Sequence, residues 1–109
     1  METKEFSKSR IFSFNESIVY SNSAIVSKTI IKKDSGNISL FAFDKEEAIS
    51  EHKANFDVLV QIIDGKAEIV INKQSFIIAT GQSIILPANV PHAIKAIERF
   101  KMLLTMLKA

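Results

Sequence analysis

The chain has 109 residues, a length typical of one domain, and 47% of them are hydrophobic and 24% charged. This is the composition of a globular protein, and it excludes disorder of the whole chain. The 14 basic and 12 acidic residues leave a net charge of only +2, and the absence of cysteine excludes disulfides, thiolate nucleophiles and zinc–thiolate sites.

The chain carries none of the patterns expected of a secreted, membrane or nucleic-acid-binding protein. Residues 1–10 are polar and lack the apolar run of a signal peptide. No apolar stretch approaches the roughly 20 residues that cross a bilayer. The lysines are scattered and do not alternate with aromatic residues, so nucleic acid is not an expected partner. We therefore expect a cytoplasmic protein that contacts neither nucleic acid nor membrane.

Short apolar runs separated by turn residues dominate the chain after the first 20 residues. Residues 24–31 and 38–43 are rich in β-branched or aromatic side chains, and a turn cluster around Gly36 separates them, which predicts two strands. Residues 56–63 are the strongest strand candidate. They end at Asp64-Gly65, the dipeptide favoured in two-residue type I′ hairpins, so residues 67–71 are predicted to return as the paired strand.

The second half of the chain continues the same pattern. Strands are predicted at residues 76–79 and 84–86, and then, after a rigid loop from Pro87 to Pro91, at residues 92–97 and 100–107. Helix propensity would also allow a helix over residues 99–107, but a meander needs a closing strand there. Turn signals recur about every 8–12 residues, which predicts an all-β antiparallel sandwich or barrel.

The whole chain, residues 1–109, is interpreted as a single domain with a barrel core over about residues 24–108. Residues 1–20 form either an N-terminal arm or an edge strand, and Phe6, Phe12 and Phe14 belong to that edge or dock on a second subunit. Two strands, 56–63 and 100–107, carry apolar side chains on both faces. Something must therefore cover the outside of the barrel, and a homodimer is the simplest cover.

The chain has two histidines, His52 and His92. A histidine taken alone is most often an ordinary core or surface residue without a ligand. Here His52 precedes a long predicted strand, and His92 follows a proline-containing turn and opens another strand. In a closed barrel, residues at such positions can point into the lumen and meet.

These two regions resemble the two motifs of the cupin family. The second motif is a glycine turn, a strand, a proline turn and a histidine, and Gly81, Pro87 and His92 match it at the right spacings. Asn89 and Ala96 replace its remaining glycine and asparagine. In the first motif His52 and Gly65 match, and 15 residues separate Gly65 from Gly81. The resemblance implies a small single-domain cupin of the conserved-barrel, RmlC-like type, with a double-stranded β-helix or jelly-roll fold.

The resemblance also implies where a metal would bind. Metal-binding cupins use three histidines and one glutamate, and of these only His52 and His92 are present, because Ala54 and Val58 occupy the other motif positions. Two imidazoles would leave most of the shell of a nickel, zinc, manganese or iron ion to water or substrate. Asp57 lies one position from the glutamate slot and would need a β-bulge to turn inward.

Several functions remain open from the sequence. The apolar residues Ala54, Val58, Val60 and Ile62, together with the two histidines, predict a pocket for a small hydrophobic molecule with one polar group. Met102 and Met106 are interpreted as core residues. We expect a metal-poor or metal-free binding protein. The alternatives are an oxygenase or isomerase-like enzyme whose two-histidine metal centre is completed by water or substrate, a metal-free acid–base enzyme, and a structural or protein-binding role.

Overall fold

A computed structural model describes residues 5–108, and almost all of its regular structure is β-strand. The only helical element in this part of the chain is one turn of 3₁₀-helix. No helix in the described residues is long and apolar enough to cross a membrane. The elements in chain order are η1 (Asn15–Ser17), β1 (Ile25–Lys33), β2 (Gly36–Phe43), β3 (Ala48–His52), β4 (Val58–Ile71), β5 (Gln74–Ala79), β6 (Ser83–Leu86) and β7 (His92–Leu107).

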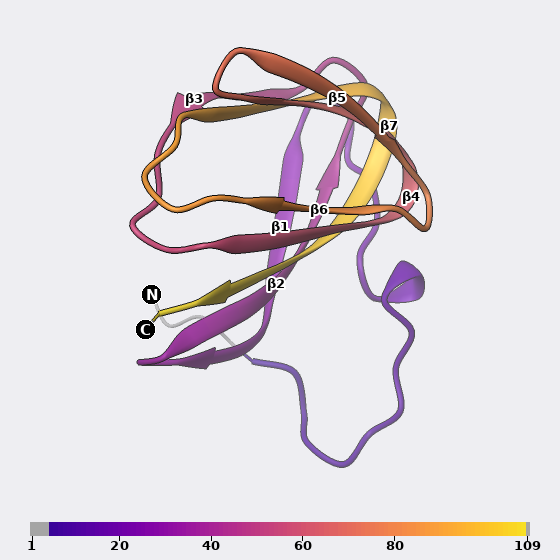
Figure 1. Ribbon diagram of the computed structural model, residues 1–109. Helices are drawn as coiled ribbons and strands as arrows, with labels where there is room; N and C mark the ends of the chain where they lie inside the picture. Colours follow the sequence, from indigo (N-terminus) through magenta and orange to yellow (C-terminus); the bar gives the residue numbers. More distant parts are fainter. Residues whose placement is uncertain (1–4, 109) are drawn as a thin grey trace.

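Two long strands, β4 and β7, organise the whole barrel, and all strand pairs are antiparallel. The carboxyl-terminal part of β7 pairs with β2 and with the start of β4, and β1 and β6 complete this larger half of the sheet. The amino-terminal part of β7 pairs with β3 and with the end of β4, and β5 completes the smaller half. In Figure 1 these strands wrap around one another with β7 curving across the molecule. The predicted all-β jelly-roll barrel is confirmed.

The predicted Asp64-Gly65 hairpin is wrong. Strand β4 runs straight through this dipeptide, and its register against β7 shifts on both sides of it. Gly65 does take a positive φ of 88°, but it uses this freedom to bend one strand from the larger half into the smaller half. The turn between β5 and β6 holds the bend, because Gly65 donates its N–H to Thr80 Oγ1 at 2.9 Å and Thr80 donates its N–H back to Gly65 O at 3.1 Å.

The end of the chain is strand, as preferred over helix, but it forms one element where two were predicted. Residues 92–97 and 100–107 belong to the single strand β7. Strand β3 was not predicted. Its sequence, AISEH, has few β-branched residues, and its pairing with β7 defines it as a strand.

The apolar side chains form two separate clusters on opposite faces of the larger half. The inner cluster fills the barrel and includes Phe43, Val60, Ile69, Phe100 and Met102, all fully buried. The outer cluster covers the opposite face of β1, β2 and β7, and its members include Ile18, Ile30, Leu40, Ala42 and Leu103. Residues from the N-terminal arm, including Ile18 with 1% of its surface exposed, therefore cover part of the outside that the sequence assigned to a partner subunit.

Polar contacts fix this arm to β7 and β4. Tyr20 donates its hydroxyl to Asp64 Oδ2 at 2.6 Å, and the Lys101 ammonium lies 5.0 Å from the centre of the Tyr20 ring. Lys101 is buried and donates to the Asn15 carbonyl oxygen at 2.6 Å. Burial, and then the hydrogen bond to the Asp64 carboxylate, raise the pKa of the Tyr20 hydroxyl. The arm is thus joined to the barrel at the same bend that Gly65 makes in β4.

A second group of polar contacts, between the segment that follows the arm and the barrel, predicts a pH effect on stability. Asp44 accepts hydrogen bonds from Arg99 Nε at 2.7 Å and from the Ser23 N–H at 2.6 Å. These hydrogen bonds, Arg99 first, lower the pKa of Asp44 from 3.8 to about 2. Because the folded pKa lies below the unfolded one, the stabilisation is present above about pH 4 and is lost as the pH falls towards 2.

We therefore expect Asp44→Asn to be less stable than the wild type at pH 6, with the difference shrinking between about pH 4 and 2. Urea unfolding followed by circular dichroism at a series of pH values measures this difference. Glu98→Gln is the control, since Glu98 is exposed and its one ion pair among residues 5–108 is a long one, 3.9 Å from Lys66. A gap between Asp44→Asn and wild type that stays constant down to pH 2 would contradict the role given to Asp44.

Candidate functional site

A partly open cavity of about 350 Å³ lies in the barrel between its two halves. The smaller half contributes His52, His92, Ile49 and Ile94, and Ala54 lies on the loop that follows β3. The wall from the larger half consists of alternate residues of β2 and β7 with one residue each from β4 and β6: Asn37, Ser39, Phe41, Met102, Leu104, Met106, Val58 and Leu86. The cavity is therefore mainly apolar, and its polar side chains are two imidazoles, one amide and one hydroxyl.

The two histidines meet across the pairing of β3 with β7. His52 and His92 are register partners, their ring centres lie 4.4 Å apart, and the two Nε2 atoms are 3.2 Å apart. His52 is exposed at the end of β3, whereas only 3% of the surface of His92 is exposed. The two rings thus form a polar site at the cavity mouth. Solvent reaches this site from the side of His52, and its other side faces the apolar cavity.

The backbone determines which nitrogen of each ring carries a hydrogen. His52 Nδ1 lies 3.0 Å from the carbonyl oxygen of Ser50, and His92 Nδ1 lies 3.3 Å from that of Val90. A carbonyl oxygen only accepts, so each Nδ1 is the donor and each neutral ring keeps its lone pair on Nε2. Two Nε2 lone pairs that face each other at 3.2 Å repel unless a proton, a hydrogen-bond donor or a cation lies between them.

The surroundings of His92 favour its neutral form. Burial is the largest effect that lowers its pKa, the nearby His52 charge lowers it further, and the hydrogen bond to Val90 opposes both. This shift favours the form of His92 in which Nδ1 donates to Val90 and Nε2 is an acceptor for a ligand.

The loops beside the histidines are tied to one another. Asn89 takes a positive φ of 62° and donates its N–H to Ala54 O at 2.7 Å. Pro91 O accepts the N–H of Asn72 at 2.9 Å, which anchors the other end of the same loop. The rigid turn before His92 is therefore held against the loop after His52, and this keeps the two rings together.

The residues predicted for the pocket divide into two groups. The structure brings His52, His92, Ala54 and Val58 together on the cavity wall. Val60 and Ile62 do not line the cavity, because β4 carries them deeper into the packed core, where they are 0% and 2% exposed. Asp57 does not turn inward: its Oδ1 accepts the Ala88 N–H at 2.8 Å on the outside of the barrel.

Other cavity residues escaped the sequence analysis. Ser39 and Phe41 alternate along the strand predicted over residues 38–43, whereas Asn37 was assigned to the preceding turn and belongs to β2, and the sequence does not show which face of this strand points inward. Met102 and Met106, interpreted as core residues, both line the cavity, although Met102 also belongs to the inner cluster. The alternation itself was the available signal, since Leu40 and Ala42 on the other face of β2 are fully apolar and buried.

A barrel of this topology, with paired histidines at one end, agrees with the family model named Cupin domain, which matches residues 39–106. The chain belongs to the cupin family. No match was found among curated proteins. The resemblance of the two sequence motifs to those of cupins is thereby confirmed.

Several solved structures are similar to most or all of this chain. A conserved protein of unknown function from Streptococcus pyogenes is 30% identical, with a TM-score of 0.92, over 100% of this chain and 96% of its own. A cupin superfamily protein from Desulfitobacterium hafniense is 28% identical, with a TM-score of 0.90, over 100% of both chains. A Cupin 2 conserved barrel domain protein from Leptotrichia buccalis is 38% identical, with a TM-score of 0.86, over 89% of this chain and only 47% of its own.

The two histidine Nε2 atoms of this cupin fit two coordination positions of a metal ion and no more. Two nitrogens that bind one ion at about 2.0–2.1 Å in neighbouring positions lie about 3.0–3.4 Å apart, and the Nε2 atoms are separated by 3.2 Å. The free lone pairs are also on the correct nitrogens. However, residues 5–108 contain no group of three or more His, Cys, Asp or Glu side chains that could hold a metal.

Proposed function

We propose that this cupin binds a small, mostly apolar organic molecule whose single polar group donates a hydrogen bond. The observation that carries the proposal is the apolar cavity of about 350 Å³ with two acceptor nitrogens at one end. This volume lies in the range of small-molecule pockets, which combine apolar walls with a few convergent polar groups. A hydroxyl would place its hydrogen where the two lone pairs now repel, a carboxylic acid would pass its proton to one Nε2 and bind as the carboxylate, and the apolar remainder would fill the barrel.

The proposal predicts which compounds stabilise the protein. Phenols and medium-chain carboxylic acids should raise the melting temperature by several degrees at high concentration, because a ligand that binds only the folded state stabilises it. Their methyl ethers and methyl esters, which lack the donor, should have little effect. Differential scanning fluorimetry on the tag-free protein measures both series.

The double variant His52→Ala/His92→Ala should lose the difference between donors and their methylated forms. Ile77→Ala is the matched control, because Ile77 is exposed on β5 outside the cavity and the discrimination should persist there. Equal shifts for acids and esters in the wild type would remove the basis of the proposal, even if the shifts were large.

A second candidate is a two-histidine metal centre that supplies Lewis-acid or oxygen chemistry, with water or substrate completing the shell. It is favoured by one observation, the 3.2 Å separation of the two Nε2 atoms with their lone pairs free. Mass spectrometry of metals in the tag-free protein, after addition of nickel, zinc, manganese or iron, tests it. Near-stoichiometric metal that disappears in the double histidine variant would support this candidate over the metal-free one.

A further inference from the structure

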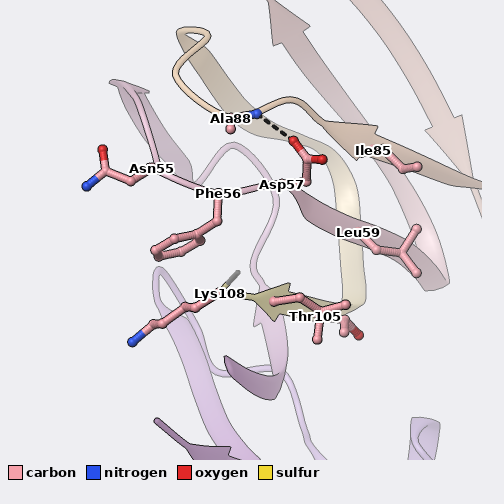
Figure 2. Close-up of a pocket in the computed structure, with 9 residues that line it drawn as sticks. Asn55, Phe56, Asp57, Leu59, Ile85, Ala88, Thr105 and Lys108 are labelled. Carbon is pink, nitrogen blue, oxygen red and sulfur yellow. Dashed lines mark hydrogen bonds between the residues drawn. The ribbon is translucent and has the colours of Figure 1, made fainter. Parts of the chain in front are cut away.

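Strands β4 and β7 separate two hollows of different chemistry. Figure 2 shows Leu59 and Thr105 beside an open hollow of about 580 Å³ on the outside of the barrel. The residues next to them in the chain, Val58, Leu104 and Met106, face the cavity that contains the histidines. Alternation along each strand therefore determines which side chains can contact a molecule bound inside the barrel.

The cavity wall on β2 and β7 runs from the mouth of the cavity to its floor. At the mouth, Met106 pairs with Asn37 near the start of β2 and with Val58 at the start of β4, and residues 53–57 join Val58 to His52. Four residues further along β2, Phe41 pairs with Met102, which is fully buried. At about 3.4 Å per residue, this floor lies about 13 Å from the mouth.

Sulfur and aromatic side chains line this path from the histidines to the floor. Met102 and Met106 are the only methionines among residues 5–108, and both face the cavity. The Phe41 ring adds an aromatic surface beside Met102. Thioether sulfur makes favourable contacts with the edges of aromatic rings, and two rings attract each other beyond the area that they bury. A saturated ligand would gain neither contribution.

We infer that the molecule held in this cavity is an aromatic alcohol or a phenol, with its hydroxyl at the histidine Nε2 atoms and its ring directed towards Phe41 and Met102. The inference rests on the proposed function, which supplies the hydrogen-bond donor, and it adds the class of the apolar part. Such a hydroxyl is uncharged at neutral pH, since even a phenol has a pKa of about 10. It therefore donates to the histidine pair without first transferring a proton, as a carboxylic acid would have to do.

A matched pair of alcohols tests the ring alone. Benzyl alcohol and cyclohexylmethanol carry the same donor and a six-membered ring, and they differ in whether that ring is aromatic. A cavity that recognised only apolar area would bind cyclohexylmethanol at least as well, because its ring is the larger one. We expect the dissociation constant of benzyl alcohol to be at least about threefold lower, measured by NMR titration of the ¹⁵N-labelled protein. Benzyl methyl ether, which lacks the hydroxyl, tests the proposed function separately.

The two sulfurs can be removed with little change in volume. Met102→Leu/Met106→Leu exchanges each methionine for a residue of similar size, a substitution that folded cores tolerate well. This variant should lose most of the preference for benzyl alcohol. Leu103→Met is the matched control, because it exchanges the same residue types on the outer face of β7, where Leu103 is 6% exposed, and it should keep the wild-type preference. Circular dichroism verifies that both variants are folded.

The methionine methyl groups report where the ring binds. In protein labelled with ¹³C at these methyl groups, the ring current of benzyl alcohol should shift the signals of Met102 and Met106, each assigned from its single leucine variant. Unshifted signals, or a preference that the double leucine variant keeps in full, would overturn the inference.

The three compounds distinguish failure of this inference from failure of the proposed function. Equal dissociation constants for the two alcohols, both below that of the ether, would overturn the aromatic class and leave the proposed function in place. Equal dissociation constants for benzyl alcohol and its methyl ether would instead overturn the proposed function. Binding of none of the three compounds would overturn both.

Discussion

Replacing Gly65 with alanine is expected to destabilise the protein by at least about 4 kcal/mol, a large part of the roughly 5–15 kcal/mol by which a native domain is stable. A side chain at this position would overlap the carbonyl oxygen of Arg99 and lie 2.8 Å from Cα of Phe100. Both are backbone atoms of β7, which cannot move away without breaking the pairing of β4 with β7. The φ of 88° adds the cost of a left-handed conformation for alanine.

The clash can be separated from the conformational cost with a second glycine. Gly81 has a φ of 87°, but a Cβ there would meet nothing within 4 Å. Gly81→Ala should therefore cost only about 1–2 kcal/mol. Urea unfolding followed by circular dichroism compares the two variants. Similar losses at both positions would show that close approach to Arg99 is not what requires a glycine at position 65.

Truncating Phe100 to alanine is expected to cost about 3–5 kcal/mol, the loss typical of a large buried aromatic side chain. Phe100 is fully buried, and its ring stacks on Phe43 with centres 4.4 Å apart and planes 23° apart. The centre of the Phe43 ring in turn lies 6.4 Å from that of Phe41, which lines the cavity. The variant would therefore loosen the cavity wall and weaken ligand discrimination as well as lower the free energy of unfolding.

Phe14→Ala provides the comparison, because Phe14 lies on the N-terminal arm and is 40% exposed. It should cost less than about 1 kcal/mol. Phe100→Leu should fall between the two alanine variants, since leucine fills part of the space. A free energy of unfolding for Phe100→Ala within 1 kcal/mol of wild type, measured with urea, would show that the Phe43–Phe100 stack does not support the core.

Most of the fold was predictable from the sequence, and Gly65 shows why one connection was not. Strand positions follow from runs of β-branched residues between turn residues, a local property of the chain. Asp64-Gly65 satisfies both a hairpin and a bend within one strand, because each needs a residue with positive φ. The choice depends on the Arg99 carbonyl, which belongs to a different strand and is invisible to a local pattern.

The candidate site also combines features that a local sequence pattern predicts with features that depend on contacts between distant strands. The motif spacing pointed to His52 and His92, but their contact joins residues 40 positions apart in the chain and needs the register of β3 against β7. Val60 and Ile62 lie on the predicted inner face of β4. That face, however, extends past the end of the cavity into the packed inner cluster. An alternating pattern identifies a buried face, whereas the depth at which the cavity ends depends on side chains from several strands.

The position of β7 in the chain has a consequence for how the protein is made. This strand lies between neighbours in both halves of the barrel and provides His92 and four other residues of the cavity on its inner face, besides Phe100 of the core. All six other strands precede it. During synthesis they emerge from the ribosome without their central partner, with unpaired edges and apolar faces exposed. Folding of the barrel must therefore wait until β7 has emerged, and the long-range pairings that follow should make it slow.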